Sequence, residues 1–294
     1  MTVHENYHSL YSIEGTQNFD QNPCFWNENT FPPFQEGLQQ FKETLVNLVD
    51  QGESKTFYKF GDGDYFFLKK IPNGSANPGR RAIGVSYDQL QNHHEFVEGT
   101  PQNDFFTCEI YPENISKFQE LYPNTLIDFP AEYGYGLTAN RWLIKQFAGK
   151  IGVIGAHEKI KLIEHLLSFN EYQEYLGIDS FNDYISIPQK FACDNLDAVE
   201  EMVAKQLNKQ EASETKIYLL GIGHVKSGLL HRLKKHKNAV YLDIGSGIDA
   251  LAGIIDPGRP YMGSWKNHLS KQFNYNLLDF LNHTPDPSKD VVLG

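Results

Sequence analysis

Two carboxylates stand two residues apart in the glycine-flanked segment Phe60-Gly61-Asp62-Gly63-Asp64. If the chain turns there, both carboxylates can face one point, and such hard oxygen ligands suit Mg²⁺ or Mn²⁺. An ion held in this way could bridge a diphosphate. The same residues also suit a structural turn between two strands. We therefore predict a metal site at Asp62 and Asp64, with the structural turn as the alternative.

A second glycine segment, from Tyr218 to Gly228, has the order strand, glycine turn, helix start. Backbone N–H groups and the helix dipole make such a turn a site for phosphate. The segment lacks the GKS or GKT ending of a Walker loop, and its third glycine comes two places too late for GxGxxG. A tight turn with an ordinary histidine is the alternative. The residues predicted to contact a phosphate here are Gly221, Gly223, His224, Lys226 and Ser227.

A third glycine segment, from Tyr241 to Asp249, looks in isolation like the first motif of S-adenosylmethionine-dependent methyltransferases. Its third glycine is replaced by Ile248 or Asp249, depending on the register. Moreover, only 45 residues follow Asp249, whereas a methyltransferase sheet needs several more strand–helix units there. The residues predicted to contact a nucleotide here are Gly245, Ser246 and Asp249.

Weaker signals come from Gly155-Ala156-His157-Glu158 and from two arginines. His157 and Glu158 follow a predicted strand and could act as a base, although a histidine at a helix start is more often a cap. Arg141 and Arg259 could neutralise a diphosphate, with structural ion pairs as the alternative. Gly155, Arg141 and Arg259 are accordingly predicted to contact the nucleotide.

The elements that must position these residues alternate between short apolar runs and amphipathic helices. Strands are predicted at Thr56–Phe60, Phe105–Ile110, Thr125–Phe129, Lys150–Ile154, Tyr184–Ile187, Lys216–Leu220 and Ala239–Ile244. Helices are predicted at Phe34–Val49, Tyr87–Val97, Pro112–Leu121, Asn140–Phe147, His157–Phe169, Leu196–Leu207 and Val225–Lys235, with a short one from Ile248. The pattern predicts an α/β, Rossmann-like fold, in which a mostly parallel sheet carries helices on both faces.

Ligands of such sheets bind at the carboxyl ends of the strands. Four glycine-containing loops follow predicted strands, at 61–64, 155–158, 221–226 and 245–249. We therefore expect all four loops at one edge of the sheet, around a single active site.

The composition limits the partners. The chain has 294 residues, with 26 Lys plus Arg against 37 Asp plus Glu and a net charge of −11. A nucleic-acid duplex needs clustered cations, so this charge argues against a duplex, whereas a single nucleotide needs only one or two cations or helix N-termini. Residues 1–33 are predicted as an irregular segment and residues 34–294 as a single domain. The oligomeric state is left open.

The same sequence predicts a cytoplasmic protein without a transmembrane segment. No apolar run approaches the roughly 18–20 residues that span a bilayer, and the start MTVHENYHSL lacks the pattern of a signal peptide. Three cysteines, Cys24, Cys108 and Cys193, lie too far apart for a CxxC metal site and are too few for a disulfide framework.

The order of the motifs resembles that of the GT-D type of glycosyltransferases. The matching segments are Phe60–Asp64, Asn140–Trp142, Lys150–Gly155, Tyr218–His224, Tyr241–Ala250 and Arg259-Pro260-Tyr261. The resemblance covers roughly residues 34–262 and implies a GT-D-like, Rossmann-like domain that transfers a hexosyl or pentosyl group. It also implies a UDP-sugar donor, a divalent ion such as manganese, and a glycan or glycoprotein acceptor, as in glycan biosynthesis.

The family signature Asp-x-Glu falls on Asp62 and Asp64, so Asp64 is one methylene shorter than the family residue. The resemblance gives Asp64 a catalytic role through the metal. If the reaction inverts the sugar, a base must deprotonate the acceptor hydroxyl, and His157, Glu158, His224 and Asp243 are all candidates. Two other hypotheses stay open: a methyltransferase or other nucleotide-cofactor enzyme, and a noncatalytic sugar- or nucleotide-binding module.

Overall fold

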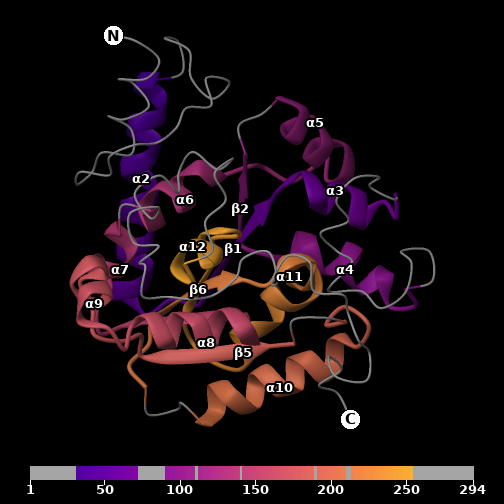
Figure 1. Ribbon diagram of the computed structural model, residues 1–294. Helices are drawn as coiled ribbons and strands as arrows, with labels where there is room; N and C mark the ends of the chain where they lie inside the picture. Colours follow the sequence, from indigo (N-terminus) through magenta and orange to yellow (C-terminus); the bar gives the residue numbers. More distant parts are fainter. Residues whose placement is uncertain are drawn as a thin grey trace.

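The computed structural model describes residues 31–71, 90–109, 112–139, 141–188, 191–209 and 213–253 (Figure 1). Residues 1–30, which make up most of the predicted irregular segment, lie outside these ranges, and so does Arg259. Within them, no helix has both the length and the apolar character that crossing a membrane requires.

The described strands form one seven-stranded sheet in the order β3-β2-β1-β7-β6-β4-β5, with each neighbouring pair parallel. The strands are β1 (Lys55–Phe60), β2 (Phe105–Cys108), β3 (Phe129–Pro130), β4 (Ile151–Ala156), β5 (Asp183–Ile187), β6 (Ile217–Gly221) and β7 (Val240–Asp243). All residues of β4, β6 and β7 are buried, as expected for strands covered on both faces. The predicted α/β class and Rossmann-like sheet are confirmed.

Two separate apolar cores lie on the two faces of this sheet. Along β1, for example, Phe57 points into one core and Tyr58 into the other, as alternation along a strand requires. The first core is covered by α2 (Phe31–Gln51), α6 (Ala131–Ala139), α7 (Trp142–Gln146), α8 (His157–Leu166), α9 (Asn170–Leu176) and α12 (Gly247–Leu251).

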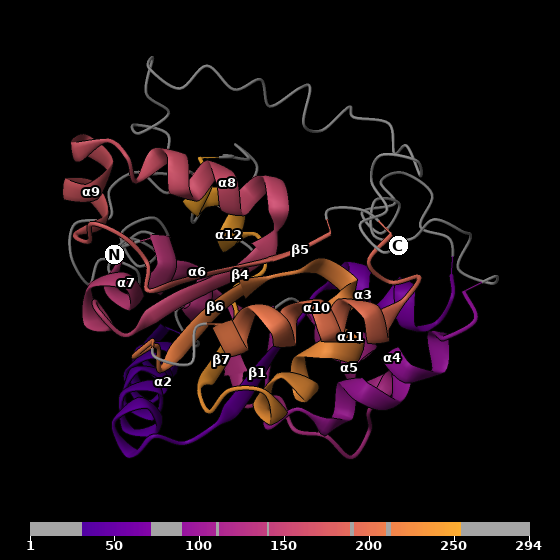
Figure 2. The same cartoon turned by 90° about the horizontal axis from the view of Figure 1, so that it is seen from below.

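The second core is covered by another set of helices, and Figure 2 shows α8 and α10 on opposite sides of the sheet. In α10, residues 196, 199, 203 and 207 are buried, which is one face of a helix. The set consists of α3 (Asp62–Leu68), α4 (His93–Gly99), α5 (Pro112–Leu121), α10 (Leu196–Lys209), α11 (Lys226–Leu229) and the 3₁₀ segments η5 (Gly223–Val225) and η6 (Leu230–Lys235).

Several predicted elements are corrected by the structure. The helix predicted from Phe34 begins at Phe31, and the segment after β1 is helix α3, so the proposed turn between two strands is wrong. The strand predicted at Thr125–Phe129 is reduced to Phe129–Pro130. Helices α6 and α9 were not predicted, because two glycines interrupt the helical pattern in α6 and α9 has only seven residues. Buried Tyr133, Tyr135 and Tyr172 hold these helices to the core.

Candidate functional site

Four loops meet at the carboxyl edge of the sheet. They follow β1, β7, β6 and β4, which are consecutive neighbours in the sheet and run in the same direction. The predicted common edge is therefore confirmed for the loops at 61–64, 245–249, 221–226 and 155–158. Among the helices that follow these loops, α11 and η5 lie on one face of the sheet and α8 and α12 on the other.

The loop after β1 is held by Asp64. Its Oδ2 accepts a hydrogen bond of 2.8 Å from the N–H of Gly61, the residue that precedes helix α3. This contact satisfies an N–H that the helix start leaves free, and it places a carboxylate at the positive end of the helix. Glycine suits position 61 because a Cβ there would lie 2.5 Å from Nζ of Lys59.

Lys226 joins three of the loops beneath the edge. Its Nζ lies 3.1 Å from Oδ2 of Asp64 and 2.9 Å from Oδ2 of Asp243. The same ammonium donates to the carbonyl oxygen of Lys59 and lies 4.8 Å from the centre of the Tyr58 ring. The lysine comes from α11, Asp64 from α3 and Asp243 from the end of β7, so one side chain ties together segments that are far apart in the sequence.

These contacts set the ionisation of Asp64. Burial opposes the charged form, since the side chain is 6% exposed, but the nearby Lys226, His224 and Lys59 outweigh it and hold the pKa of the carboxyl well below its usual range. Asp64 is therefore a permanent anion at neutral pH.

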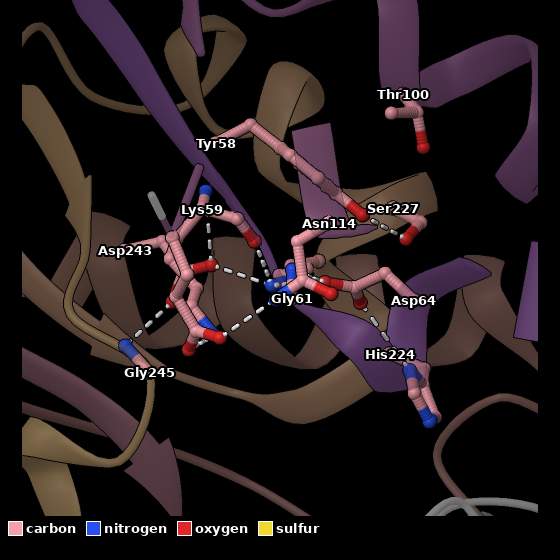
Figure 3. Close-up of polar contacts among 12 residues, drawn as sticks. Tyr58, Lys59, Gly61, Asp64, Thr100, Asn114, His224, Ser227, Asp243 and Gly245 are labelled. Atoms are coloured by element: carbon pink, nitrogen blue, oxygen red, sulfur yellow. Dashed lines mark hydrogen bonds and ion pairs between the residues drawn. The ribbon is translucent and has the colours of Figure 1, made fainter. Parts of the chain in front are cut away.

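His224 lies on the other side of this carboxylate (Figure 3). Its Nδ1 is 3.4 Å from Oδ1 of Asp64, and its ring stacks on Phe67 with 4.6 Å between centres and 11° between planes. The second nitrogen, Nε2, has no hydrogen-bond partner among the described residues. A carboxylate at Nδ1 favours the tautomer whose proton is on Nδ1 and whose Nε2 carries a lone pair.

A second charged group extends the edge on the opposite face of the sheet, and none of its members was predicted. Nζ of Lys59 lies 3.1 Å from Oε1 of Glu109, and the other oxygen of Glu109 accepts from Asn114 at 3.0 Å. The hydroxyl of Tyr135 donates to Oε1 at 3.0 Å. The available signals were a lysine inside the apolar strand KTFYKF and a glutamate directly after the strand FFTC.

The glycine turns differ in what surrounds them. Gly223 is exposed, has φ +59°, and a Cβ there would meet no described atom within 4 Å. Gly221, in contrast, lies under α12, where a Cβ would come within 2.0 Å of Ile248. Gly245 has φ +50°, and its N–H donates to Oδ1 of Asp243 at 2.9 Å (Figure 3). Gly223 therefore leaves open space at the edge, whereas Gly221 permits close packing.

The other residues predicted for the site lie in different surroundings. His157 and Glu158 begin α8 and are exposed, while Asp249 forms an ion pair with Lys159. Ser246 is half-buried in the loop after β7.

Two residues that were predicted to contact the nucleotide lie in the protein interior instead. The hydroxyl of Ser227 is buried and lies 2.8 Å from that of Tyr58, and Gly155 is packed between Ile160 and Ile248.

Arg141 is not part of the Lys226 cluster. It lies at the start of α7 with φ +67°, and its guanidinium stacks on Tyr175 of α9, 4.5 Å from the ring centre. The side chain of Asp62 and the whole of Arg259 lie outside the described part of the chain.

The described residues around Asp64 do not fit the predicted metal site. Both carboxylate oxygens already face protein donors, and an ammonium 3.1 Å away would repel an ion bound to them. Across the described ranges, no group of three or more His, Cys, Asp or Glu side chains is arranged to hold a metal ion. The Mn²⁺ or Mg²⁺ ion stays a prediction from the sequence.

Comparisons with known proteins add little to this geometry. No protein-family model matches the chain, and a search of curated proteins gives no match. Among solved structures, "A New Glycosyltransferase (DUF1792) from Streptococcus sanguinis" aligns with a TM-score of 0.43 and 17% identity, over 71% of this chain and 81% of that chain. This similarity is too low to transfer a fold or an activity, so the fold rests on the parallel sheet itself and the function on the site.

Proposed function

We propose that the protein is a glycosyltransferase that moves a sugar from a nucleotide-sugar donor to a hydroxyl of a glycan acceptor. A UDP-sugar is the first donor to test. The observation that carries this proposal is the position of His224. It lies at the carboxyl edge of the sheet, beside the open Gly223 turn, with Asp64 on one ring nitrogen and the other nitrogen unpaired among the described residues. The sequence motifs that resemble GT-D enzymes support the same assignment.

The open turn at Gly223 is where we place the diphosphate of the donor. The empty space beside its Cα lets the backbone approach a phosphate closely, which a side chain would prevent. The loop after β7, with Gly245 and half-buried Ser246, faces the same edge and offers further polar groups.

Of the four candidate bases, His224 is best placed to take the acceptor proton. Asp243 is buried and already accepts from Lys226 and from the N–H of Gly245. His157 and Glu158 are exposed, and no described residue orients them as Asp64 orients His224. In the proposed step, the acceptor proton passes to Nε2 of His224 as the acceptor oxygen bonds to the anomeric carbon. The bond from that carbon to the diphosphate breaks, and its electron pair leaves with the diphosphate.

This single displacement inverts the anomeric centre. Inversion is therefore the stereochemical outcome that we propose, and NMR of the product's anomeric proton measures it. A retained configuration would remove His224 from the role of acceptor base.

A ligand panel tests the donor. Thermal unfolding is followed with UDP, several UDP-sugars and S-adenosylmethionine, each with Mn²⁺ and with chelator. A donor at 100 times its Kd stabilises the fold by ~2.7 kcal/mol. Stabilisation by S-adenosylmethionine alone would replace this proposal by a methyltransferase, and binding of UDP-sugars without any turnover would favour a noncatalytic module.

The variant His224→Gln tests the catalytic group separately. Glutamine keeps a polar side chain but cannot take a proton, so we expect transfer to fall by at least about 100-fold while UDP binds as before. Equal losses in UDP binding and in turnover would assign His224 to donor binding instead.

A further inference from the structure

The ammonium group of Lys226 is surrounded by oxygen atoms. Asp64, Asp243 and the carbonyl of Lys59 each supply one oxygen, at 3.1 Å and 2.9 Å for the two carboxylates. An ammonium has three N–H donors and no acceptor, so all three donors are used. The side chain is 6% exposed, which keeps water away from the group.

Two carboxylate oxygens and one carbonyl oxygen are also the ligands that hard divalent cations prefer. The three oxygens come from α3 directly after β1, from the end of β7 and from β1 itself, and Asp64 is one of the two residues at which the sequence predicted a metal ion. The oxygen set of a cation site is thus present at this edge, and a lysine of the same chain fills it.

Removal of the ammonium would leave two buried carboxylates facing the same point. Such a pair is strongly unfavourable unless a cation or a proton compensates it. Coulomb attraction to a divalent ion in this place would be far greater than at the protein surface, because the pair is shielded from solvent.

We propose that Lys226 is the resident cation of this edge, occupying the position that a divalent ion would take between Asp64 and Asp243, so that the site binds its ligand without such an ion. The ammonium holds the three loops in register and pairs with both carboxylates. The statement about ligand binding rests on the proposed function; the statement about the cation position does not.

The first experiment measures Mn²⁺ binding to the full chain by electron paramagnetic resonance, without any nucleotide. Wild type is expected to bind no stoichiometric Mn²⁺ in the micromolar range. Lys226→Ala, in which the space between the carboxylates is vacated, is expected to bind one Mn²⁺ per chain, at least about tenfold more tightly than wild type. With Mn²⁺ at 100 times its Kd, its Tm should rise by about 5 °C.

Two control variants separate a cation site from a general loss of charge. Lys226→Met removes the charge but fills the space, so it should gain no Mn²⁺. Lys237→Ala removes a lysine that pairs with Asp183 near the opposite edge of the sheet, away from Asp64 and Asp243, and should also gain none. Asp243→Asn added to Lys226→Ala should abolish the gained ion.

If Lys226→Ala does not fold, Mn²⁺ binding to the wild-type protein still tests the proposal. Stoichiometric Mn²⁺ on wild type at micromolar concentration would overturn it, as would a folded Lys226→Ala that takes up no ion. UDP titration of wild type with chelator then tests the ligand statement. Binding that requires Mn²⁺ overturns it, whereas no UDP binding under any condition contradicts the proposed function and leaves the result for the cation position standing.

Discussion

Two buried lysine–aspartate pairs lie near opposite ends of the same sheet. At the carboxyl edge, Lys226 contacts Asp64 and Asp243. At the amino edge, Nζ of Lys237 lies 3.2 Å from Oδ2 of Asp183, which also accepts from the hydroxyl of Tyr218. Both aspartates are buried, and the pKa of each is lowered because hydrogen bonds and nearby charges outweigh the effect of burial.

The difference lies in what surrounds each pair. Asp183 is the first residue of β5, and its partners come from β6 and from the segment before β7, so this pair aligns strand starts. The Lys226 pair is next to an open glycine turn and to His224, whose Nε2 has no partner in the described part of the chain. Burial and a shifted pKa therefore do not distinguish the two edges, whereas open space and unused hydrogen-bonding capacity among the described residues do.

The largest difference between the two pairs should appear in activity. Asp64→Asn removes the charge that orients His224 and pairs with Lys226, so transfer should fall by at least about 100-fold, or about 2.7 kcal/mol of transition-state stabilisation. Donor-dependent transfer is measured together with a melting curve. Near wild-type transfer by a folded Asp64→Asn protein would contradict the role given to the Asp64–His224 pair.

At the amino edge the matched change should affect stability alone. Asp183→Asn leaves Lys237 beside a neutral amide, but this lysine is 12% exposed and can turn partly toward water. We expect the free energy of unfolding at pH 7 to fall by about 2 kcal/mol, with transfer per folded molecule unchanged. Urea unfolding and transfer assays measure the two quantities, and a loss of transfer greater than the loss of folded protein would extend the functional site to this edge.

The stability cost of Asp183→Asn should also depend on pH. Because the pKa of Asp183 is lowered in the folded state, the charged carboxylate stabilises the fold above the unfolded pKa of about 3.9, and this contribution is lost as pH falls below that value. Urea unfolding of wild type and variant at pH 7, 5 and 3 should give equal differences at pH 7 and 5 and a smaller one at pH 3. A difference that grows at pH 3 would contradict the sign.

The sequence predicted the strands of the sheet more closely than the contacts between their side chains. The strands β4, β6 and β7 were placed to within one or two residues, since each is a short apolar run ended by glycine or followed closely by one. Their common direction followed from the alternation with helices, and so did the shared edge.

The sequence could not show which side chains turn inward. Lys226 was predicted to contact phosphate, as a lysine near a glycine turn often does, yet it lies beneath the edge and pairs with Asp64, more than 160 positions earlier in the chain. Glu109 and Lys59 were missed for the same reason: their pairing depends on the register of β1 with β2, which no local pattern contains.

The smallest predicted effect compares two glycines with nearly the same backbone. Gly223 at the carboxyl edge has φ +59°, Gly52 between α2 and β1 has φ +69°, and a Cβ at either position meets no described atom within 4 Å. Alanine is strained in this left-handed region, so both Gly223→Ala and Gly52→Ala should lower the free energy of unfolding by about 1 kcal/mol.

The added methyl group at position 223 would also occupy the space assigned to the donor diphosphate, and UDP affinity should therefore fall by about fivefold, which corresponds to about 1 kcal/mol. Gly52→Ala should leave UDP affinity unchanged, because that turn lies near the amino edge. Calorimetric titration of UDP into both variants measures the comparison after matched urea unfolding. Equal UDP affinity in the two proteins would move the diphosphate away from the Gly223 turn.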